Sequence, residues 1–188
     1  MSTPKIKWQN GAIYHVGTRG NHKEKLFNDL EDFNVYLGKL EESLIYYKEL
    51  NYTVVAYCLM SNHVHLLIKT DKAPLTSLMR RLNSTYALYY NLKYKCVGHL
   101  FEGRYFYEMI TDYGHLLELS RYIHLNPVRA NIVDHPKKYK WSSYTMFVGN
   151  RKLNIINPEI VLDRFVSKKR YKEFVENAII SNKKIPII

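Results

Sequence analysis

The chain has 188 residues, which is enough for a single domain with a buried core. Its 28 lysines and arginines outnumber its 17 aspartates and glutamates. The formal charge of +11 favours a polyanionic partner such as a nucleic acid, although solubility alone is another reading of this charge. Two cysteines exclude a disulfide framework and a Cys-x-x-Cys zinc site. No apolar run approaches the roughly 20 residues that span a membrane, and residues 1–5 lead into no apolar signal segment, so we expect a cytoplasmic protein with no membrane partner.

Hydrophobic periodicity predicts three strands and a helix in the first part of the chain. Residues 12–18 read as a strand. Residues 30–50 carry apolar side chains at spacings of three and four, which indicates a helix. Residues 52–60 are rich in β-branched and aromatic residues, and a two-residue turn joins them to a third strand over 63–70, so this pair is predicted to be a hairpin.

The next part of the chain predicts a helix, a strand and a further helix. Pro74 opens a helix that runs to about Lys95, residues 104–110 form a fourth strand, and Asp112 caps a last helix. The order βαββαβ followed by a helix predicts an α+β protein with a ferredoxin-like antiparallel sheet. In that arrangement the first and third strands are central.

Pro127 limits the last of these helices. Because a proline disfavours the helical conformation of the residue before it, we expect the helix to end at Asn126. Residues 128–149 then read as irregular, with residues 141–144 as an anchoring segment. Residues 150–188 read as a helical or partly ordered basic extension.

Two histidines one residue apart begin the third predicted strand. Since side chains alternate along a strand, His63 and His65 share one face, and Val64, Leu66 and Ile68 face the other side. Two imidazoles on one face can share a metal ion. An isolated His-x-His pattern is equally typical of a half-buried strand with hydrogen-bonded histidines.

The last helix offers two further polar side chains. Tyr122 and Asn126 are four residues apart, so a helix would place a phenol and an amide oxygen on one face, with His124 off that face. Among 17 tyrosines, core roles are the commonest. We interpret the other histidines as surface or hydrogen-bonding residues, and these are His15, His99, His115 and His124.

These motifs occur together in an order that is far more specific than any one of them. The chain resembles the single-tyrosine transposases with a His-hydrophobe-His (HUH) motif. The resemblance rests on His63–His65, on residues 59–62 directly before them, and on residues 122–130. Among these transposases the chain is most similar to the REP-associated tyrosine transposases. The resemblance covers roughly residues 10–147 and also takes in residues 14–16, 19–21, 98–104 and 141–144.

The resemblance implies a metal-dependent single-stranded DNA endonuclease and strand transferase. On the matching positions, Tyr122 is the nucleophile, His63 and His65 are metal ligands, and Asn126 takes the place of the third protein ligand. Related insertion-sequence enzymes often have glutamine there. The metals of the family are Mg²⁺ or Mn²⁺. A mixed set of nitrogen and oxygen ligands suits Mn²⁺ and tolerates Mg²⁺ mainly when phosphate oxygens complete the shell, and on ligand softness alone zinc would bind too.

The resemblance also implies how the chain is organised and what it binds. Residues 1–149 would form the catalytic domain and residues 150–188 a basic C-terminal extension. The partner would be single-stranded or hairpin DNA, and the protein would act as a monomer or a homodimer. Independently of the resemblance, the candidate DNA-binding residues are Arg19, Asn21, Arg80, Arg81, Arg104, Arg121 and Arg129, although each of these arginines could equally be a solvated surface charge.

The residue types agree with this chemistry. A phenol with an ordinary pKa of about 10 is mostly protonated at neutral pH, and a divalent cation on the phosphate compensates for this weak nucleophile. Attack by Tyr122 would form a 5′-phosphotyrosine and release a 3′-hydroxyl. Glu102 or Asp112 could assist as an acid, a base or a metal partner.

Two other functions remain open from the sequence. One is a catalytically silent DNA- or RNA-hairpin-binding module that uses the same sheet. The other is a metallohydrolase that activates water and forms no covalent tyrosine link. A protein–DNA adduct that survives denaturation would separate the transposase-like function from both.

Overall fold

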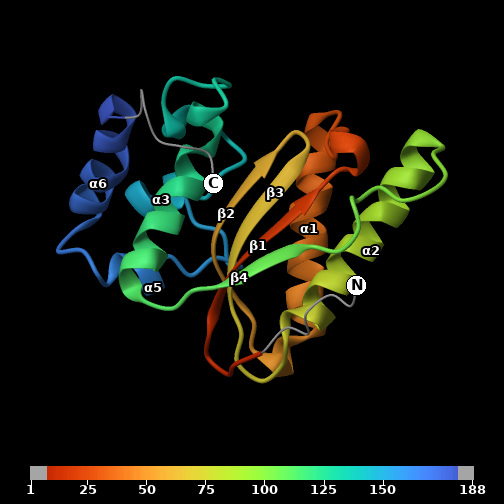
Figure 1. Ribbon diagram of the computed structural model, residues 1–188, viewed down its shortest axis with the longest axis horizontal. Coiled ribbons are helices and arrows are strands. Elements are labelled where there is room, and N and C mark those ends of the chain that lie inside the picture. The colour runs from red at the N-terminus through yellow and green to blue at the C-terminus, as the bar shows by residue number, and fades with distance from the viewer. Residues whose placement is uncertain (1–7, 182–188) are drawn as a thin grey trace.

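The computed structural model describes residues 8–181, so residues 1–7 and 182–188, the two ends of the predicted domain and extension, lie outside the described residues. Its centre is a four-stranded sheet in the order β2-β3-β1-β4 (Figure 1). The strands are β1 (Ile13–Arg19), β2 (Thr53–Met60), β3 (His63–Lys69) and β4 (Phe106–Met109), and all neighbours are antiparallel. The predicted ferredoxin-like α+β order is confirmed, with β1 and β3 central.

Three long helices cover the sheet. α1 (Leu30–Tyr46) and α2 (Leu75–Tyr94) lie together on one side, and α3 (Tyr113–Arg129) lies on the other (Figure 1). α1 begins at a capping box formed by Asp29 and Asp32, and ends four residues before the predicted end at residue 50. Residues 48–50, which were predicted to belong to this helix, form a separate 3-10 turn.

Short helices and the longer α6 lie in the connections and in the C-terminal part. Among the described residues they are η1 (Asn21–Lys23), η2 (Lys48–Leu50), η3 (Pro136–Lys138), α4 (Tyr144–Val148), α5 (Glu159–Leu162) and α6 (Lys168–Ser181). The irregular conformation predicted for residues 128–149 is therefore wrong at η3 and α4. No helix within residues 8–181 combines the length and the apolar character needed to cross a membrane.

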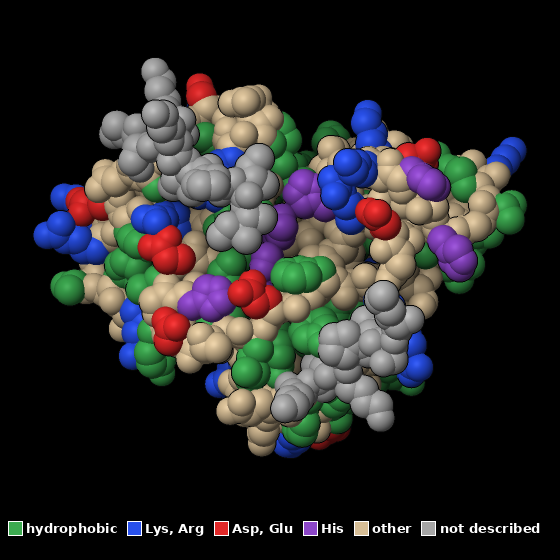
Figure 2. All heavy atoms as spheres, in the orientation of Figure 1, with side chains coloured by type: hydrophobic (Ala, Val, Ile, Leu, Met, Phe, Trp, Pro, Cys, Tyr) green, Lys and Arg blue, Asp and Glu red, His purple; other side chains and the backbone are tan. Residues whose placement is uncertain are grey.

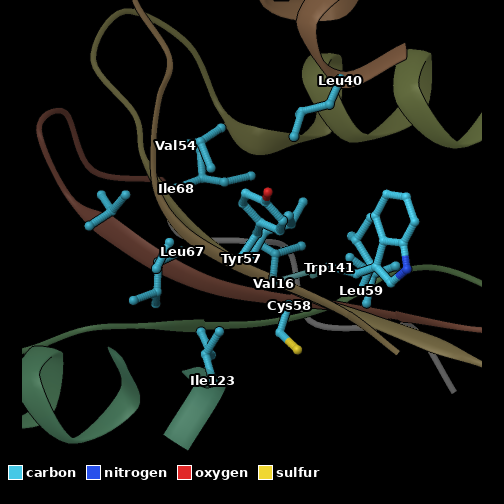
Figure 3. Close-up of a cluster of buried hydrophobic side chains, with 14 of the residues drawn as sticks. Val16, Leu40, Val54, Tyr57, Cys58, Leu59, Leu67, Ile68, Ile123 and Trp141 are labelled. Carbon is cyan, nitrogen blue, oxygen red and sulfur yellow. The ribbon is translucent and has the colours of Figure 1, made fainter. Parts of the chain in front are cut away.

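Alternation along the strands divides the core into two layers. Val64, Leu66 and Ile68 are buried on the face that α1 and α2 cover, as predicted. Figure 3 shows Ile68 on the same side of the sheet as Leu40 of α1, whereas Leu67 points toward Ile123 of α3. The face that carries His63 and His65 is thus partly covered by α3 and partly open.

The segment between α3 and α4 covers the outer edge of β2. The backbone N–H of Leu59 donates to the carbonyl of Trp141 at 2.9 Å, and that of Ser143 donates to the carbonyl of Tyr57 at 3.0 Å. Further along the same edge, the N–H of Asn157 donates to the carbonyl of Val54. These hydrogen bonds pair backbone groups that β2, as an edge strand, would otherwise leave exposed. The predicted anchoring role of residues 141–144 is confirmed.

The predicted end of the last helix at Asn126 is wrong. α3 continues through Pro127 to Arg129, and the N–H of Ala130 donates to the carbonyl of Asn126 at 2.9 Å. Proline removes one backbone hydrogen bond and disfavours a helical residue before it. Here Leu125, Asn126 and Pro127 are all buried, and this packing outweighs the local preference.

α6 packs against α3 and α4. The fully buried Tyr171 of α6 places its hydroxyl 2.8 Å from Nδ1 of His124 and 3.2 Å from Oγ of Ser120, both on α3. On the other side of the ring, Nε2 of His124 lies 2.8 Å from Oγ of Ser143. Residues 150–188 were expected to be helical or partly ordered, and the described part of them contains α5 and α6. The boundary between a domain of 1–149 and an extension of 150–188 stays a prediction.

Replacing the Tyr171 hydroxyl tests whether α6 holds α3 in place. We expect Tyr171→Phe to lower the free energy of unfolding by about 1–3 kcal/mol, because the buried Nδ1 of His124 loses its partner. Tyr46→Phe is the control, since Tyr46 is 63% exposed and the change removes the same atom at the surface. Urea denaturation of both variants measures the difference, and equal stabilities would contradict this role of Tyr171.

Candidate active site

β3 places the two predicted metal ligands side by side. The ring centroids of His63 and His65 are 4.9 Å apart, and both rings are partly exposed. In the register with β1, His63 lies opposite Arg19 and His65 lies opposite Gly17. Because Gly17 has no side chain, the ring of Phe106 lies over it, with Cδ1 3.6 Å from the position that a Cβ of Gly17 would take.

α3 brings the predicted nucleophile and the predicted third ligand to the same place. The ring centroid of Tyr122 is 5.5 Å from that of His65. Nδ2 of Asn126 is 3.2 Å from Nε2 of His65, and Asn126 also hydrogen-bonds to His63. The helical spacing of Tyr122 and Asn126 therefore directs both side chains toward the histidine pair, as predicted, and His124 points away from it.

One open cleft of about 760 Å³ lies between α3 and the sheet, and its lining includes His63, His65, Tyr122 and Asn126. Figure 2 shows histidine side chains gathered in a hollow near the middle of this face, with basic and acidic side chains nearby. The walls include four charged residues and one exposed aromatic residue, which are Arg19, Glu102, Arg104, Arg129 and Phe106. The cleft thus joins potential metal ligands, a phenol and positive charge.

The hydrogen bonds of Asn62 determine which ring nitrogen of His63 carries the proton. Nδ2 of Asn62 donates to the carbonyl of Lys23 at 3.2 Å, so its other amide atom is the oxygen. That oxygen lies 2.7 Å from Nδ1 of His63. An amide oxygen only accepts hydrogen bonds, so Nδ1 carries the proton. In the neutral ring the lone pair is then on Nε2, where a metal could bind.

Burial favours the neutral form of both imidazoles. It is the main cause that lowers the pKa of His65 well below its ordinary value, with contributions from His15 and His63. Burial also lowers the pKa of His63. A hydrogen bond to Asn126 raises this pKa in part, and the charge of Arg19 makes a smaller contribution that lowers it. Neutral imidazoles are the form that binds metal ions.

The structure brings only part of the predicted phosphate-binding set to the cleft. Arg19, Arg104 and Arg129 line it, and the guanidinium of Arg129 lies 5.0 Å from the ring centroid of Tyr122. Glu102 also lines the cleft, whereas Asp112 caps α3 by accepting from the N–H of His115 at 2.8 Å.

The other predicted phosphate-binding residues lie elsewhere. Arg80 and Arg81 belong to α2 on the opposite side of the sheet, and the guanidinium of Arg81 lies 3.8 Å from the ring centroid of Tyr46. Arg121 pairs with Glu118 and stacks on Phe174 at 4.5 Å. Asn21 begins η1, outside the lining of the cleft.

Sequence reasoning missed one residue of this site. Nε2 of His15, on β1, lies 3.0 Å from Nδ1 of His65, although His15 was interpreted only as a surface or hydrogen-bonding histidine. The hydrogen bond agrees with that interpretation, but its partner was not foreseen. Strand alternation carried the signal, because it puts His15 on the same face as Gly17 and Arg19 in a strand predicted to pair with the third.

Comparison with known families assigns the chain to one of them. The family described as IS200-like transposases matches residues 9–126, which include the histidine pair, Tyr122 and Asn126. The chain is a member of the IS200-like transposase family. No curated protein sequence matches it.

Two solved structures resemble this chain. A REP-associated tyrosine transposase bound to a REP hairpin matches with a TM-score of 0.67 and 13% identity, over 89% of this chain and 100% of that one. This match shows a common fold. A protein of Deinococcus radiodurans R1 described as a transposase candidate gives 16% identity and a TM-score of 0.43, over 65% of this chain and 95% of that one.

Buried histidines make the stability of this transposase dependent on pH. Burial lowers the pKa of His124 to about 3, and burial together with the charge of His115 lowers that of His15 to about 4. The unfolded chain takes up these protons near its ordinary pKa of 6.5, and the folded protein does so only at lower pH. We therefore expect the free energy of unfolding to fall below pH 6.5, by up to about 1.4 kcal/mol per pH unit for each histidine.

Urea denaturation at about pH 7.5 and about pH 5, at constant ionic strength, measures this loss. The decrease should continue toward about pH 4 for His15 and about pH 3 for His124. A free energy of unfolding that stays constant across this window would mean that the folded protein protonates both imidazoles as easily as the unfolded chain does.

Proposed function

We propose that this family member is a metal-dependent enzyme that nicks and joins single-stranded DNA through a covalent bond to Tyr122. The observation that carries the proposal is the common cleft of Tyr122, His63, His65 and Asn126, which lies beside Arg19 and other basic residues. A silent binding module has no need for a phenol beside two neutral imidazoles.

The side chains present fit a divalent cation. The neutral ring of His63 has its lone pair on Nε2, and Nε2 of His65 and the amide of Asn126 face the same space. Residues 8–181 contain no group of three His, Cys, Asp or Glu side chains that could hold a metal, so the amide oxygen of Asn126 would be the third protein ligand. Nitrogen and amide oxygen ligands suit Mn²⁺, and Mg²⁺ when phosphate oxygens complete its shell.

The reaction is an in-line displacement at phosphorus. A bound divalent cation would neutralise the non-bridging oxygens and polarise the phosphorus atom. The oxygen of Tyr122 attacks phosphorus and loses its proton, the bond to the 3′ oxygen breaks, and that oxygen leaves as a 3′-hydroxyl. The product is a 5′-phosphotyrosine, which conserves the ester bond so that a new 3′-hydroxyl can reverse the step.

Single-stranded DNA beside a hairpin is the proposed substrate. The neighbour with the same fold is a transposase bound to a REP hairpin. In this chain Arg19, Arg104 and Arg129 supply positive charge along the cleft, and phosphate contacts of this kind hold a strand without reading its sequence. Phe106 is 56% exposed in the same cleft and gives an unpaired base an aromatic surface.

Removing the phenol oxygen tests the nucleophile. We expect Tyr122→Phe to abolish cleavage and the covalent adduct while binding of hairpin DNA changes little, because the change removes one oxygen and little volume. Denaturing electrophoresis with end-labelled DNA detects the adduct, and Tyr113→Phe is the control, since Tyr113 is a 59% exposed tyrosine of the same helix. An adduct of normal yield in Tyr122→Phe would show that another residue is the nucleophile.

Removing either imidazole tests the metal site. We expect His63→Ala or His65→Ala to lower Mn²⁺ affinity and DNA cleavage together, because each change removes a ligand. Calorimetric titration with Mn²⁺ measures the affinity. His99→Ala is the matched control, since His99 is exposed and outside the cleft. An equal loss of affinity in all three variants would contradict a site shared by His63 and His65.

The state of the DNA strand tests the substrate. The cleft lies between a helix and a sheet, and in-line attack needs a scissile phosphate free of a complementary strand. We expect cleavage of a single-stranded segment beside a hairpin and no cleavage of fully paired DNA of the same sequence. Comparable turnover of both substrates with Mn²⁺ would favour a general metal-dependent nuclease instead.

A further inference from the structure

His15 has no role in the reaction as described, yet its ring lies against that of His65. The two ring centroids are 5.2 Å apart with planes inclined by 23°, and Nε2 of His15 is 3.0 Å from Nδ1 of His65. His15 is 6% exposed. It therefore forms the inner wall behind one of the two proposed metal ligands.

The surrounding structure holds the His15 ring in this position. The pairing of β1 with β3 sets Gly17 opposite His65, so His15 approaches His65 diagonally across the strand pair. The ring of Phe106 packs edge-on against His15 at 5.7 Å between centroids, and that of Tyr122 does so at 6.3 Å. A rotation of the His15 ring away from His65 would disturb both contacts.

The proton between these two rings decides whether His65 can bind a metal. If Nδ1 of His65 carries the proton and donates to His15, the lone pair of His65 is on Nε2, which faces Asn126. If His15 donates instead, the proton of a neutral His65 is on Nε2 and blocks coordination there. Only the first arrangement matches His63, whose Nδ1 is already committed to Asn62.

Building on the proposed metal site, we propose that His15 is a positioning residue that accepts a hydrogen bond from Nδ1 of His65 and keeps its Nε2 lone pair directed at the divalent cation. Asn62 does the same for His63. Such partners behind a metal-binding histidine fix its tautomer and orientation, and losing one costs about 10- to 100-fold in metal affinity.

A further observation favours this role over simple packing. Within residues 8–181, Nδ1 of His15 is buried without a hydrogen-bond partner, so the contact to His65 is the only hydrogen bond that its side chain makes. Buried polar atoms are rarely left unpaired, and an apolar ring would fill the same space without that cost.

Metal titration of two substituted proteins tests the proposal. His15→Phe keeps an aromatic ring and removes the acceptor, whereas His15→Gln places a carboxamide oxygen near the position of Nε2. We expect His15→Phe to weaken Mn²⁺ binding about 10- to 100-fold and His15→Gln to restore most of it. Electron paramagnetic resonance of free Mn²⁺ measures the affinity, thermal melting verifies folding, and His99→Phe is the matched control because His99 is exposed.

Each outcome separates this inference from the proposed function. If the unsubstituted protein binds Mn²⁺ and His15→Phe binds it equally well, the role of His15 is overturned and the metal site stands. If His15→Gln is as weak as His15→Phe, the acceptor is not what matters and the role is again overturned. If the unsubstituted protein does not bind Mn²⁺, the metal site itself fails, and the role of His15 with it.

A measurement on the unsubstituted protein covers the case in which His15→Phe does not fold. Nuclear magnetic resonance of the ¹⁵N-labelled protein should detect a coupling across the hydrogen bond between Nδ1 of His65 and Nε2 of His15, with the proton on His65. A proton on Nε2 of His65, or on His15 at this hydrogen bond, would overturn the proposal.

Discussion

The antiparallel pairing of β1 with β3 sets which side chains reach the cleft. In this register Val16 lies opposite Leu66, and both are buried under α1 and α2, whereas His65 lies on the open face. Because side chains alternate with a period of two, a slip of one residue would turn the imidazoles into the apolar layer and expose its aliphatic side chains. The free energy of burying those side chains therefore also maintains the positions of His15 and His63.

The position of Tyr122 relative to the sheet depends on a second layer of packing. Ile123 lies near Leu67 and Cys58 of the sheet (Figure 3), and His124 is held by hydrogen bonds to Ser143, which directly precedes α4, and to Tyr171 of α6. These buried contacts are made by residues next to Tyr122 in the sequence but on another face of α3. A change beneath the helix would thus alter the distance between the phenol and the imidazoles without touching either. The segment after residue 149 contributes to this support through Tyr171.

Local patterns in the sequence predict the order of the elements and the common face of His63 and His65, because periodicity and alternation are properties of neighbouring residues. They do not predict the end of α3, since the burial of Pro127 depends on parts of the chain far away in sequence. Alternation along the first strand indicates the face of His15, but its hydrogen bond to His65 joins residues 50 apart in the sequence and follows from no local pattern. Positive charge alone also could not assign Arg81 to the face of the sheet opposite the cleft.

The proposed ligand set carries no negative charge, which has a consequence for DNA binding. Two imidazoles and an amide would leave a divalent cation with its full charge, whereas carboxylates would neutralise part of it. The cation would therefore act strongly on a phosphate but be held weakly by the protein alone, and phosphate oxygens would complete its shell. Binding of metal and of DNA should then strengthen each other by the same factor, as linkage requires. The guanidinium of Arg129 beside Tyr122 adds to the attraction for the phosphate at the point where the new ester bond would form.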